Sequence, residues 1–307
     1  MAWLPVAWSL ALAAAAPAML APPVVPNVAT PAADSSEAFD TGLDRVRRMT
    51  IPISVNGAGP YHFTIDTGAD RSVVSDRLAA ELALPAGREV TMHGVTGTQQ
   101  IATVKVDRIK LGVNETRAVT TPVLPERSLG AVGFLGTDVL AGHSVVLDFR
   151  KHRIMLDRSR RDSAMMASSG SSDEITVVAR SRFGQLILTD ASVNGVKVYA
   201  IIDTGAENTI GNPALRRLLL GDRPMGAASE LIGVAGGSIP CELASVPRIR
   251  LGGMHLGNMP VAYADAATFR RFRVDKVPAI LVGMDVLRSF ARVAVDFGRR
   301  EVRFQLS

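Results

Sequence analysis

Short apolar runs rich in Val and Ile recur along most of the chain, and Gly, Pro or Asn interrupts them roughly every 8 to 12 residues. This spacing predicts strands, because a half-buried strand alternates its side chains with a period of two. In the first half we expect strands at MTIPISV, YHFTID, IATVKVDRIKL and SVVLDF. Helical periodicity is confined to 75–84, to 213–220 and to short pieces after Asp138 and Asp285. The pattern therefore predicts an all-β protein with few helices.

The order of motifs in the first half recurs in the second half. A shared Ser-Val-Asn-Gly segment, an Asp-Thr-Gly-Ala turn, a Gly-Val-x-Gly segment and three later apolar motifs follow one another in both halves. The matched pairs are 54–57 and 192–195, 66–69 and 203–206, 93–97 and 232–236, 109–112 and 249–252, 133–140 and 280–287, and 145–149 and 293–297. Such a repeat predicts two copies of one folding unit.

Three segments without sustained periodicity set the expected boundaries. Residues 1–21 are apolar and include Ala16-Pro17-Ala18, a possible cleavage tripeptide, which favours a signal peptide or, since no Lys or Arg precedes the run, an N-terminal anchor. Residues 22–44 and 159–180 are rich in turn-forming and polar residues and predict a flexible linker and an inter-lobe linker. The two lobes are then expected at 45–158 and 181–307.

The two Asp-Thr-Gly-Ala turns carry the candidate chemistry. Asp66 and Asp203 each close an apolar strand and open a glycine turn at the same place in the repeat. A third Asp-Thr-Gly, at 40–42, has no preceding strand pattern and no matched copy, so we interpret it as an ordinary loop. Two carboxyls that share one proton can activate water and protonate a leaving amide, so each turn would supply half of a site.

In this order of features the chain resembles aspartic peptidases of the retroviral, or retropepsin-like, type, including the bacterial members. The resemblance implies two homologous β-barrel lobes in tandem, arranged as in pepsin around a central cleft, with Asp66 and Asp203 as the catalytic pair. It assigns support of the turns to Thr67, Gly68, Ala69, Thr204, Gly205 and Ala206. It also implies flaps that cover the substrate, at His93, Gly94, Val95, Thr96 and Gly97 and at Gly233, Val234, Ala235, Gly236 and Gly237.

Three further roles follow from the resemblance. Gly136 and Gly283 would pack behind the catalytic turns, while Asp138 and Asp285 fit helix caps or charge partners better than catalysts. Pepsin-like relatives often carry Ser or Thr where Ala69 and Ala206 stand, and alanine has no donor for the carboxylate. Because hydrogen bonds to the charged form lower a pKa, we expect a pair that works nearer neutral pH than a gastric enzyme.

Composition narrows the function classes. The chain has 307 residues, 47% hydrophobic and 21% charged, with a formal charge of +5. Its arginine clusters, such as Arg45, Arg47 and Arg48, lack interleaved aromatics, which favours a solvated surface over a nucleic-acid site. The five histidines show no metal-ligand spacing, and the single Cys241 permits no intramolecular disulfide and fits a small, partly buried residue. We expect no metal and no cofactor.

The leading interpretation is an exported, monomeric aspartic endopeptidase, periplasmic or secreted, that cleaves a protein or peptide substrate. If the N-terminal segment is retained, the protein would be membrane-anchored. One alternative is a non-catalytic peptide-binding or scaffold module that has kept the fold. Another keeps the enzyme but pairs each lobe with the same lobe of a second chain; tethering of the two lobes favours internal pairing.

Overall fold

The computed structural model describes residues 37–44, 48–159, 174–221 and 227–306. All of them belong to one compact unit, 36–307. The predicted signal peptide or anchor and the central part of the inter-lobe linker lie outside the described residues. No helix in the described ranges has the length and apolar character needed to cross a membrane.

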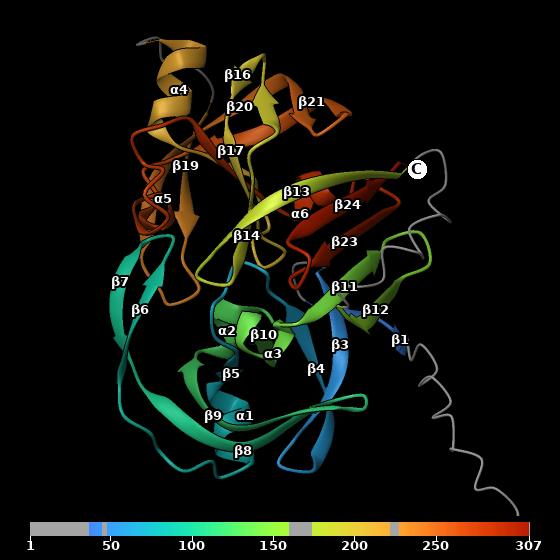
Figure 1. Cartoon of the computed structure of the whole chain (residues 1–307). Coiled ribbons are helices and arrows are strands. Elements are labelled where there is room, and N and C mark those ends of the chain that lie inside the picture. The colour runs from blue at the N-terminus through green and yellow to red at the C-terminus, as the bar shows by residue number, and fades with distance from the viewer. Residues whose placement is uncertain (1–36, 45–47, 160–173, 222–226, 307) are drawn as a thin grey trace, which may run out of the picture. The chain divides into compact units, whose positions relative to one another are not determined.

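The first lobe is a closed barrel of six strands (Figure 1). Around the barrel run β3 (Met49–Val55), β4 (Ala58–Ile65), β10 (Gly133–Leu135), β5 (Val73–Ser75), β9 (Asn114–Leu124) and β8 (Thr103–Leu111), and β8 closes against β3. Short helices α1 (Asp76–Glu81), α2 (Glu126–Leu129) and α3 (Thr137–Leu140) join them. A separate hairpin, β6 (Val90–Gly94) with β7 (Gly97–Ile101), stands beside the barrel.

The second lobe repeats this plan, with β14 (Gln185–Leu188) and β15 (Ala191–Val193) together in the place of β3. The other strands are β17 (Tyr199–Ile202), β22 (Ala279–Val282), β18 (Ile210–Gly211), β21 (Met254–Tyr263) and β20 (Ser238–Leu251), with short β16 (Val196–Lys197). The helices are α4 (Pro213–Leu220), α5 (Ala267–Arg271) and α6 (Met284–Leu287). Strand β19 (Ala227–Ile232) pairs with β20 as the second hairpin. The two-lobed all-β prediction is confirmed.

Strands from both halves form one continuous sheet. Its order is β1 (Glu37–Asp40), β12 (Arg153–Arg158), β11 (His143–Asp148), β23 (Arg292–Asp296), β24 (Glu301–Gln305) and β13 (Glu174–Arg182). Strands β11 and β23 run antiparallel at its centre, with Val146 opposite Ala294 (Figure 1). Backbone hydrogen bonds therefore join the lobes directly.

The predicted linkers at 22–44 and 159–180 are both wrong at their C-terminal ends, which form strands. Residues 37–44 contain β1 and also β2 (Gly42–Leu43), so the third Asp-Thr-Gly joins two strands. Residues 174–180 belong to β13. Strand β1 is the outer strand of the shared sheet and pairs with β12, whereas β13 pairs with β24 and, through its second half, with β14 of the second barrel. Neither segment has a long apolar run. Each forms a strand because it pairs with a strand distant in sequence, which the local pattern cannot reveal.

Each barrel encloses its own apolar core. Phe63, Leu78 and Leu135 are fully buried in the first lobe, and Leu215, Ile280 and Phe290 in the second. Two smaller apolar clusters lie apart from these cores. The first-lobe cluster consists of Val73, Ile101, Leu124, Leu129, Ala131 and Phe134; the second-lobe cluster includes Ile187, Ile201, Ile210, Phe269 and Phe272. These clusters face the site described next.

Candidate active site

The two Asp-Thr-Gly turns begin where a barrel strand ends. Asp66 follows β4, and its N–H donates to the Leu135 carbonyl at 2.9 Å. Asp203 follows β17, and its N–H donates to the Val282 carbonyl at 3.1 Å. In each lobe the strand runs parallel to the partner that supplies this carbonyl. The apolar strand thus fixes the backbone of the aspartate and leaves its side chain at the strand end.

The threonines of the two turns bond across the lobes. Thr67 Oγ1 donates to the Ile202 carbonyl at 2.9 Å, and Thr204 Oγ1 donates to the Ile65 carbonyl at 2.7 Å. Each threonine N–H also donates to the hydroxyl of the other threonine, both at 3.1 Å. Both side chains are buried. Reciprocal hydrogen bonds therefore hold the two turns together.

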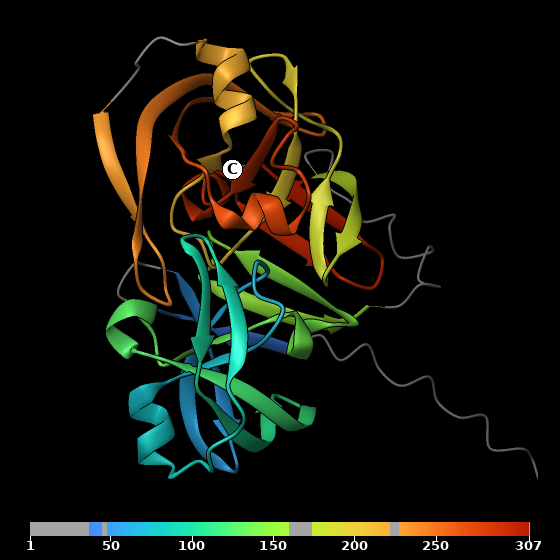
Figure 2. The same cartoon turned by 90° about the vertical axis from the view of Figure 1, so that its left-hand side faces the viewer.

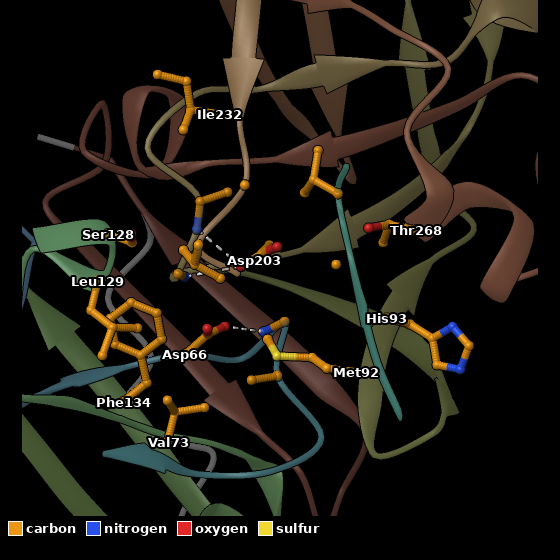
Figure 3. A pocket seen from close by; sticks show the side chains of 18 of the residues that line it. Asp66, Val73, Met92, His93, Ser128, Leu129, Phe134, Asp203, Ile232 and Thr268 are labelled. Atoms are coloured by element: carbon orange, nitrogen blue, oxygen red, sulfur yellow. Dashed lines mark hydrogen bonds between the residues drawn. The ribbon is translucent and has the colours of Figure 1, made fainter. Parts of the chain in front are cut away.

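The turn glycines allow the two carboxyl groups to approach each other. A Cβ atom on Gly68 would clash with the Asp203 carboxyl, and one on Gly205 would clash with the Asp66 carboxyl. Within each turn the glycine N–H donates to the aspartate of its own lobe, at 2.9 Å to Asp66 and 3.0 Å to Asp203 (Figure 3). Each carboxyl thus lies against the turn of the opposite lobe.

Burial governs the ionisation of this pair. Burial and the charge of Asp203 raise the pKa of Asp66 to about 8, although Arg48 and backbone N–H groups oppose the rise. Burial also raises the pKa of Asp203, against hydrogen bonds from the N–H groups of Ala206 and Gly205. Like charges in a buried site cannot both form cheaply, so the pair holds a proton over a wide pH range. One carboxyl can then act as an acid while the other acts as a base.

Arg48 is a site residue that the sequence analysis missed. The prediction of a solvated arginine is wrong for it, because Arg48 is buried and pairs with Asp44 at 2.6 Å. Its Nη1 donates to the Gly205 carbonyl at 2.8 Å, and its guanidinium lies 4.7 Å from the centre of the Phe134 ring. Arg45 and Arg47 lie outside the described residues. The sequence next to Arg48 gives no local sign that this side chain is buried, because a buried arginine is recognised by the partners that surround it in the fold.

Polar side chains behind the turns hold the Gly136 and Gly283 segments in place. Asp138 Oδ1 accepts bonds from the Ser72 N–H at 2.9 Å and hydroxyl at 2.7 Å, and Asp285 binds Thr209 in the same way. A Cβ on Gly136 would meet the backbone of residue 71. Asp138 and Asp285 were expected to be helix caps or charge partners, but the N-caps of α3 and α6 are Gly136 and Gly283, and the two aspartates instead accept hydrogen bonds from Ser72 and Thr209. The sequence analysis did not single out Ser72 and Thr209, because only their equivalent positions in the repeat distinguish them from other polar residues.

A cavity of about 780 Å³ surrounds the pair, and the two hairpins contribute to its walls. Both carboxyls project into it (Figure 3), and apolar side chains flank them on each side, including Val73, Met92, Leu129 and Phe134 in the first lobe and Ile210, Leu231 and Phe272 in the second. Such a cavity has the size and apolar lining of a ligand site.

The predicted flap segments are the tips of these hairpins. The first flap hairpin is β6 with β7, and the second is β19 with the start of β20 (Figure 2). Val95 packs against the second-lobe cluster, while Val234 and Ala235 pack against the first-lobe cluster. Thr96 Oγ1 donates to the Gly236 carbonyl at 2.9 Å, which joins the two tips. Each tip therefore reaches the opposite lobe.

Not every flap candidate faces the pair. Gly94, Val95, Gly233 and Val234 line the cavity, whereas Thr96 and Gly236 serve the contact between tips. His93 is exposed at the rim, and its Nδ1 lies 3.1 Å from the Thr98 hydroxyl within the same hairpin. Cys241 is buried outside this cavity. Among the described residues no group of three or more His, Cys, Asp or Glu side chains is placed to hold a metal.

Comparison with known families agrees with this geometry. A family described as "gag-polyprotein putative aspartyl protease" matches residues 51–142, and a family described as "Aspartyl protease" matches residues 189–286. A comparison with curated proteins gave no match. The two family matches fall on the two barrels and include both Asp-Thr-Gly turns. The chain therefore belongs to the retropepsin-like aspartyl proteases and carries two domains of this family in tandem.

Proposed function

We propose that this protein is an aspartic endopeptidase in which Asp66 and Asp203 act as one catalytic pair. The observation that carries the proposal is that each carboxyl lies against the glycine of the opposite turn, at the base of one cavity. Retention of both aspartates, both threonines and both glycines supports activity, because a domain that had lost catalysis need not keep any of them.

The reaction would use the pair in two roles. The ionised carboxyl accepts a proton from a water molecule, which attacks the peptide carbonyl carbon, while the protonated carboxyl donates to the carbonyl oxygen. Proton transfer to the amide nitrogen then releases the amine and restores the pair. The raised pKa of Asp66 supports this division, because it keeps one proton on the pair near neutral pH.

The substrate would be an extended peptide segment that lies between the lobes. The flap hairpins would bind its backbone by strand-like hydrogen bonds, and apolar side chains beside the scissile bond would enter the first-lobe and second-lobe clusters. The joined flap tips must separate for such a segment to enter, since they meet over the cavity.

The direct test is cleavage of an unfolded protein between pH 3 and 8 by the parent, Asp66→Asn and Asp203→Asn. We expect each substitution to lower kcat/KM by at least about 1000-fold, because neither carboxyl can act alone. We expect the optimum of the parent to lie above about pH 3.5. Asp107→Asn, an exposed aspartate of β8 that does not line the cavity, is the matched control. Activity that survives either catalytic substitution would exclude the shared pair.

The second candidate function is a peptide-binding module without catalysis, which the apolar cavity by itself would support equally well. The same experiment separates the two: the binding module would hold an extended peptide in a titration followed by fluorescence, yet leave it intact at every pH. Product formation by the parent and its loss in both variants would exclude this candidate.

We also propose that the active species is a monomer and that it is exported to the periplasm or the exterior. The internal pairing of β11 with β23 supports the first part. Sedimentation should give one active species at the mass of a single chain. For export, the apolar character of residues 1–21 is the support. Fractionation of cells, with the N-terminus of the mature protein determined, tests export and cleavage together; protein found only in the cytoplasm would contradict export.

A further inference from the structure

The repeat places Arg48 and Gln185 at the same position of the two lobes. In the first lobe Thr50 pairs with Thr64, two residues before Asp66. In the second lobe Ile187 pairs with Ile201, two residues before Asp203. Thr50 and Ile187 are therefore equivalent, and so are the residues two positions before them, which are Arg48 and Gln185.

These two side chains make the same contact in opposite directions. Arg48 Nη1 donates to the carbonyl of Gly205, and Gln185 Nε2 donates to the carbonyl of Gly68. Each thus crosses to the other lobe and holds the glycine of the opposite catalytic turn. Because the carboxyl of Asp66 lies against Gly205 and that of Asp203 against Gly68, each contact lies directly behind one carboxyl.

The two residues differ in charge and in their remaining contacts. Arg48 Nη2 also donates to the Leu129 carbonyl at 2.5 Å, and its Nε donates to Asp44 at 2.6 Å. Asp44 in turn accepts the backbone N–H of Arg48 at 2.7 Å. Gln185 is equally buried, but its Oε1 has no hydrogen-bond partner among the described residues. One turn is therefore held by a neutral amide and the other by an anchored cation.

We propose that Arg48 and Gln185 are unequal positioning residues of the catalytic pair: both hold the opposite turn, and only Arg48 adds a charge that stabilises the ionised pair. This inference rests on the proposed function for its kinetic consequence. The Nη1 group of Arg48 donates to the Gly205 carbonyl while Asp44 binds at Nε, so the guanidinium contacts the turn against which the Asp66 carboxyl lies.

No other cation in the described part of the cavity wall is comparably placed. Arg271 is half-buried and pairs with Asp70 at 2.7 Å. The remaining charged or titratable residues of the wall are exposed and lie where solvent screens them: Arg71, His93, Arg127, Glu207 and Glu230. The positive charge of Arg48 lowers the pKa of both Asp66 and Asp203.

The test compares the pH dependence of kcat/KM in the parent, Arg48→Gln and Arg48→Lys. Arg48→Gln gives both lobes the same neutral residue and should move both limbs of the profile upward by about one pH unit, because a nearby positive charge lowers carboxyl pKa values. Arg48→Lys keeps the charge and should keep the limbs near those of the parent, even if kcat falls through poorer positioning. A folded Arg48→Gln variant with an unshifted profile would overturn the proposal.

The converse variant covers the case in which Arg48→Gln does not fold. Gln185→Arg adds a second cation and should move both limbs downward, while the double variant Arg48→Gln, Gln185→Arg should return them toward the parent. An unshifted profile in folded Gln185→Arg would contradict the charge effect.

A readout independent of peptidase activity separates this proposal from the proposed function. Titration of the aspartate carboxyl carbons by NMR should show the two highest apparent pKa values moving upward in Arg48→Gln and downward in Gln185→Arg. If the parent cleaves nothing but these shifts occur, the proposed function fails and the inference on Arg48 stands. If the parent cleaves and no shift occurs, the inference alone fails.

Discussion

Asp66 and Asp203 owe their chemistry to their surroundings more than to their own side chains. A free aspartate ionises near 3.8, whereas burial and the neighbouring charge raise the pKa of Asp66 to about 8. The unfolded chain then releases this proton at a lower pH than the folded chain. Between about pH 4 and 8 the folded state binds more protons, so its stability must fall as the pH rises.

Asp66→Asn should remove most of this dependence, because an amide cannot ionise. We expect the Tm of the parent, relative to that of Asp66→Asn, to fall by roughly 5–10 °C between pH 4 and 8 and to change little above pH 8. Differential scanning calorimetry across this range measures it. Asp107→Asn, which removes an exposed carboxylate of β8, should follow the parent curve. Parallel curves for the parent and Asp66→Asn would show that the pKa of Asp66 is not raised.

The turn glycines are as restrictive as the aspartates. A methyl group on Gly68 would occupy the space of the Asp203 carboxyl. Gly68→Ala should therefore push the carboxyls apart, lower kcat/KM by about 100-fold or more and destabilise the protein by about 1–3 kcal/mol. Gly257→Ala is the matched control, because the nearest atom to its added Cβ would be the Pro247 carbonyl oxygen at 3.7 Å. Equal effects of the two substitutions would contradict the close approach.

The contact between the two flap tips is asymmetric, because only one of the two equivalent side chains can donate a hydrogen bond. Thr96, at the tip of β6 and β7, donates to the Gly236 carbonyl, whereas its counterpart in the second hairpin is Ala235, which has no hydroxyl. Gln99 Nε2 adds a longer bond of 3.3 Å to the same carbonyl. The described side-chain hydrogen bonds between the two tips therefore use donors of the first hairpin, while the Ala267 N–H of the second lobe donates to the Val95 carbonyl at 2.9 Å.

Thr96→Val should weaken this contact and let the tips open more often. Loss of one hydrogen bond of about 1 kcal/mol should speed amide exchange in residues 94–97 and 233–237 by about fivefold. Hydrogen exchange followed by mass spectrometry measures it. Thr98→Val is the control, since that hydroxyl contacts only His93 of its own hairpin in the described interactions. Unchanged exchange at both tips in Thr96→Val would mean that the other contacts hold them, namely apolar packing and the hydrogen bonds of Gln99 and of the Ala267 N–H.

At the scale of the molecule, two of the connections between the lobes are the threonine contacts of the turns and the sheet in which β11 pairs with β23. Both connections use residues of the two halves of one chain. Both aspartates therefore belong to one molecule, and we expect the site to be complete within it, because the tether keeps the two lobes together.

Mixing inactive variants tests this completeness. A mixture of Asp66→Asn and Asp203→Asn should remain inactive, because each molecule would carry only one functional aspartate. If lobes were exchanged between chains, refolding equal amounts of the two variants together would regain roughly a quarter of the parent activity, because about half of the pairs would be mixed and each mixed pair would have one intact site. If each lobe paired with the same lobe of another chain, either variant alone would stay active. An assay of the separate and the co-refolded variants distinguishes these outcomes.

Much of this architecture can be read from sequence because it depends on local patterns repeated twice. The apolar runs before Asp66 and Asp203 and the glycines after them determine a strand and a turn wherever they occur, and their recurrence in register predicts two equal lobes. The positions of the flap hairpins follow from the same register. Local chemistry determined these features, so no distant contact was needed to find them.

The tertiary structure decided what depends on partners far apart in the chain. Residues 37–40 and 42–43 became strands because they pair with β12 and β3, and Arg48 became a buried cation because Asp44 and the turn of the opposite lobe surround it. The same applies to the reach of each flap tip across to the other lobe. The sequence by itself thus determined which residues could form a catalytic pair. Burial and contacts between the lobes decided the protonation of that pair, since they arise only when the two copies meet.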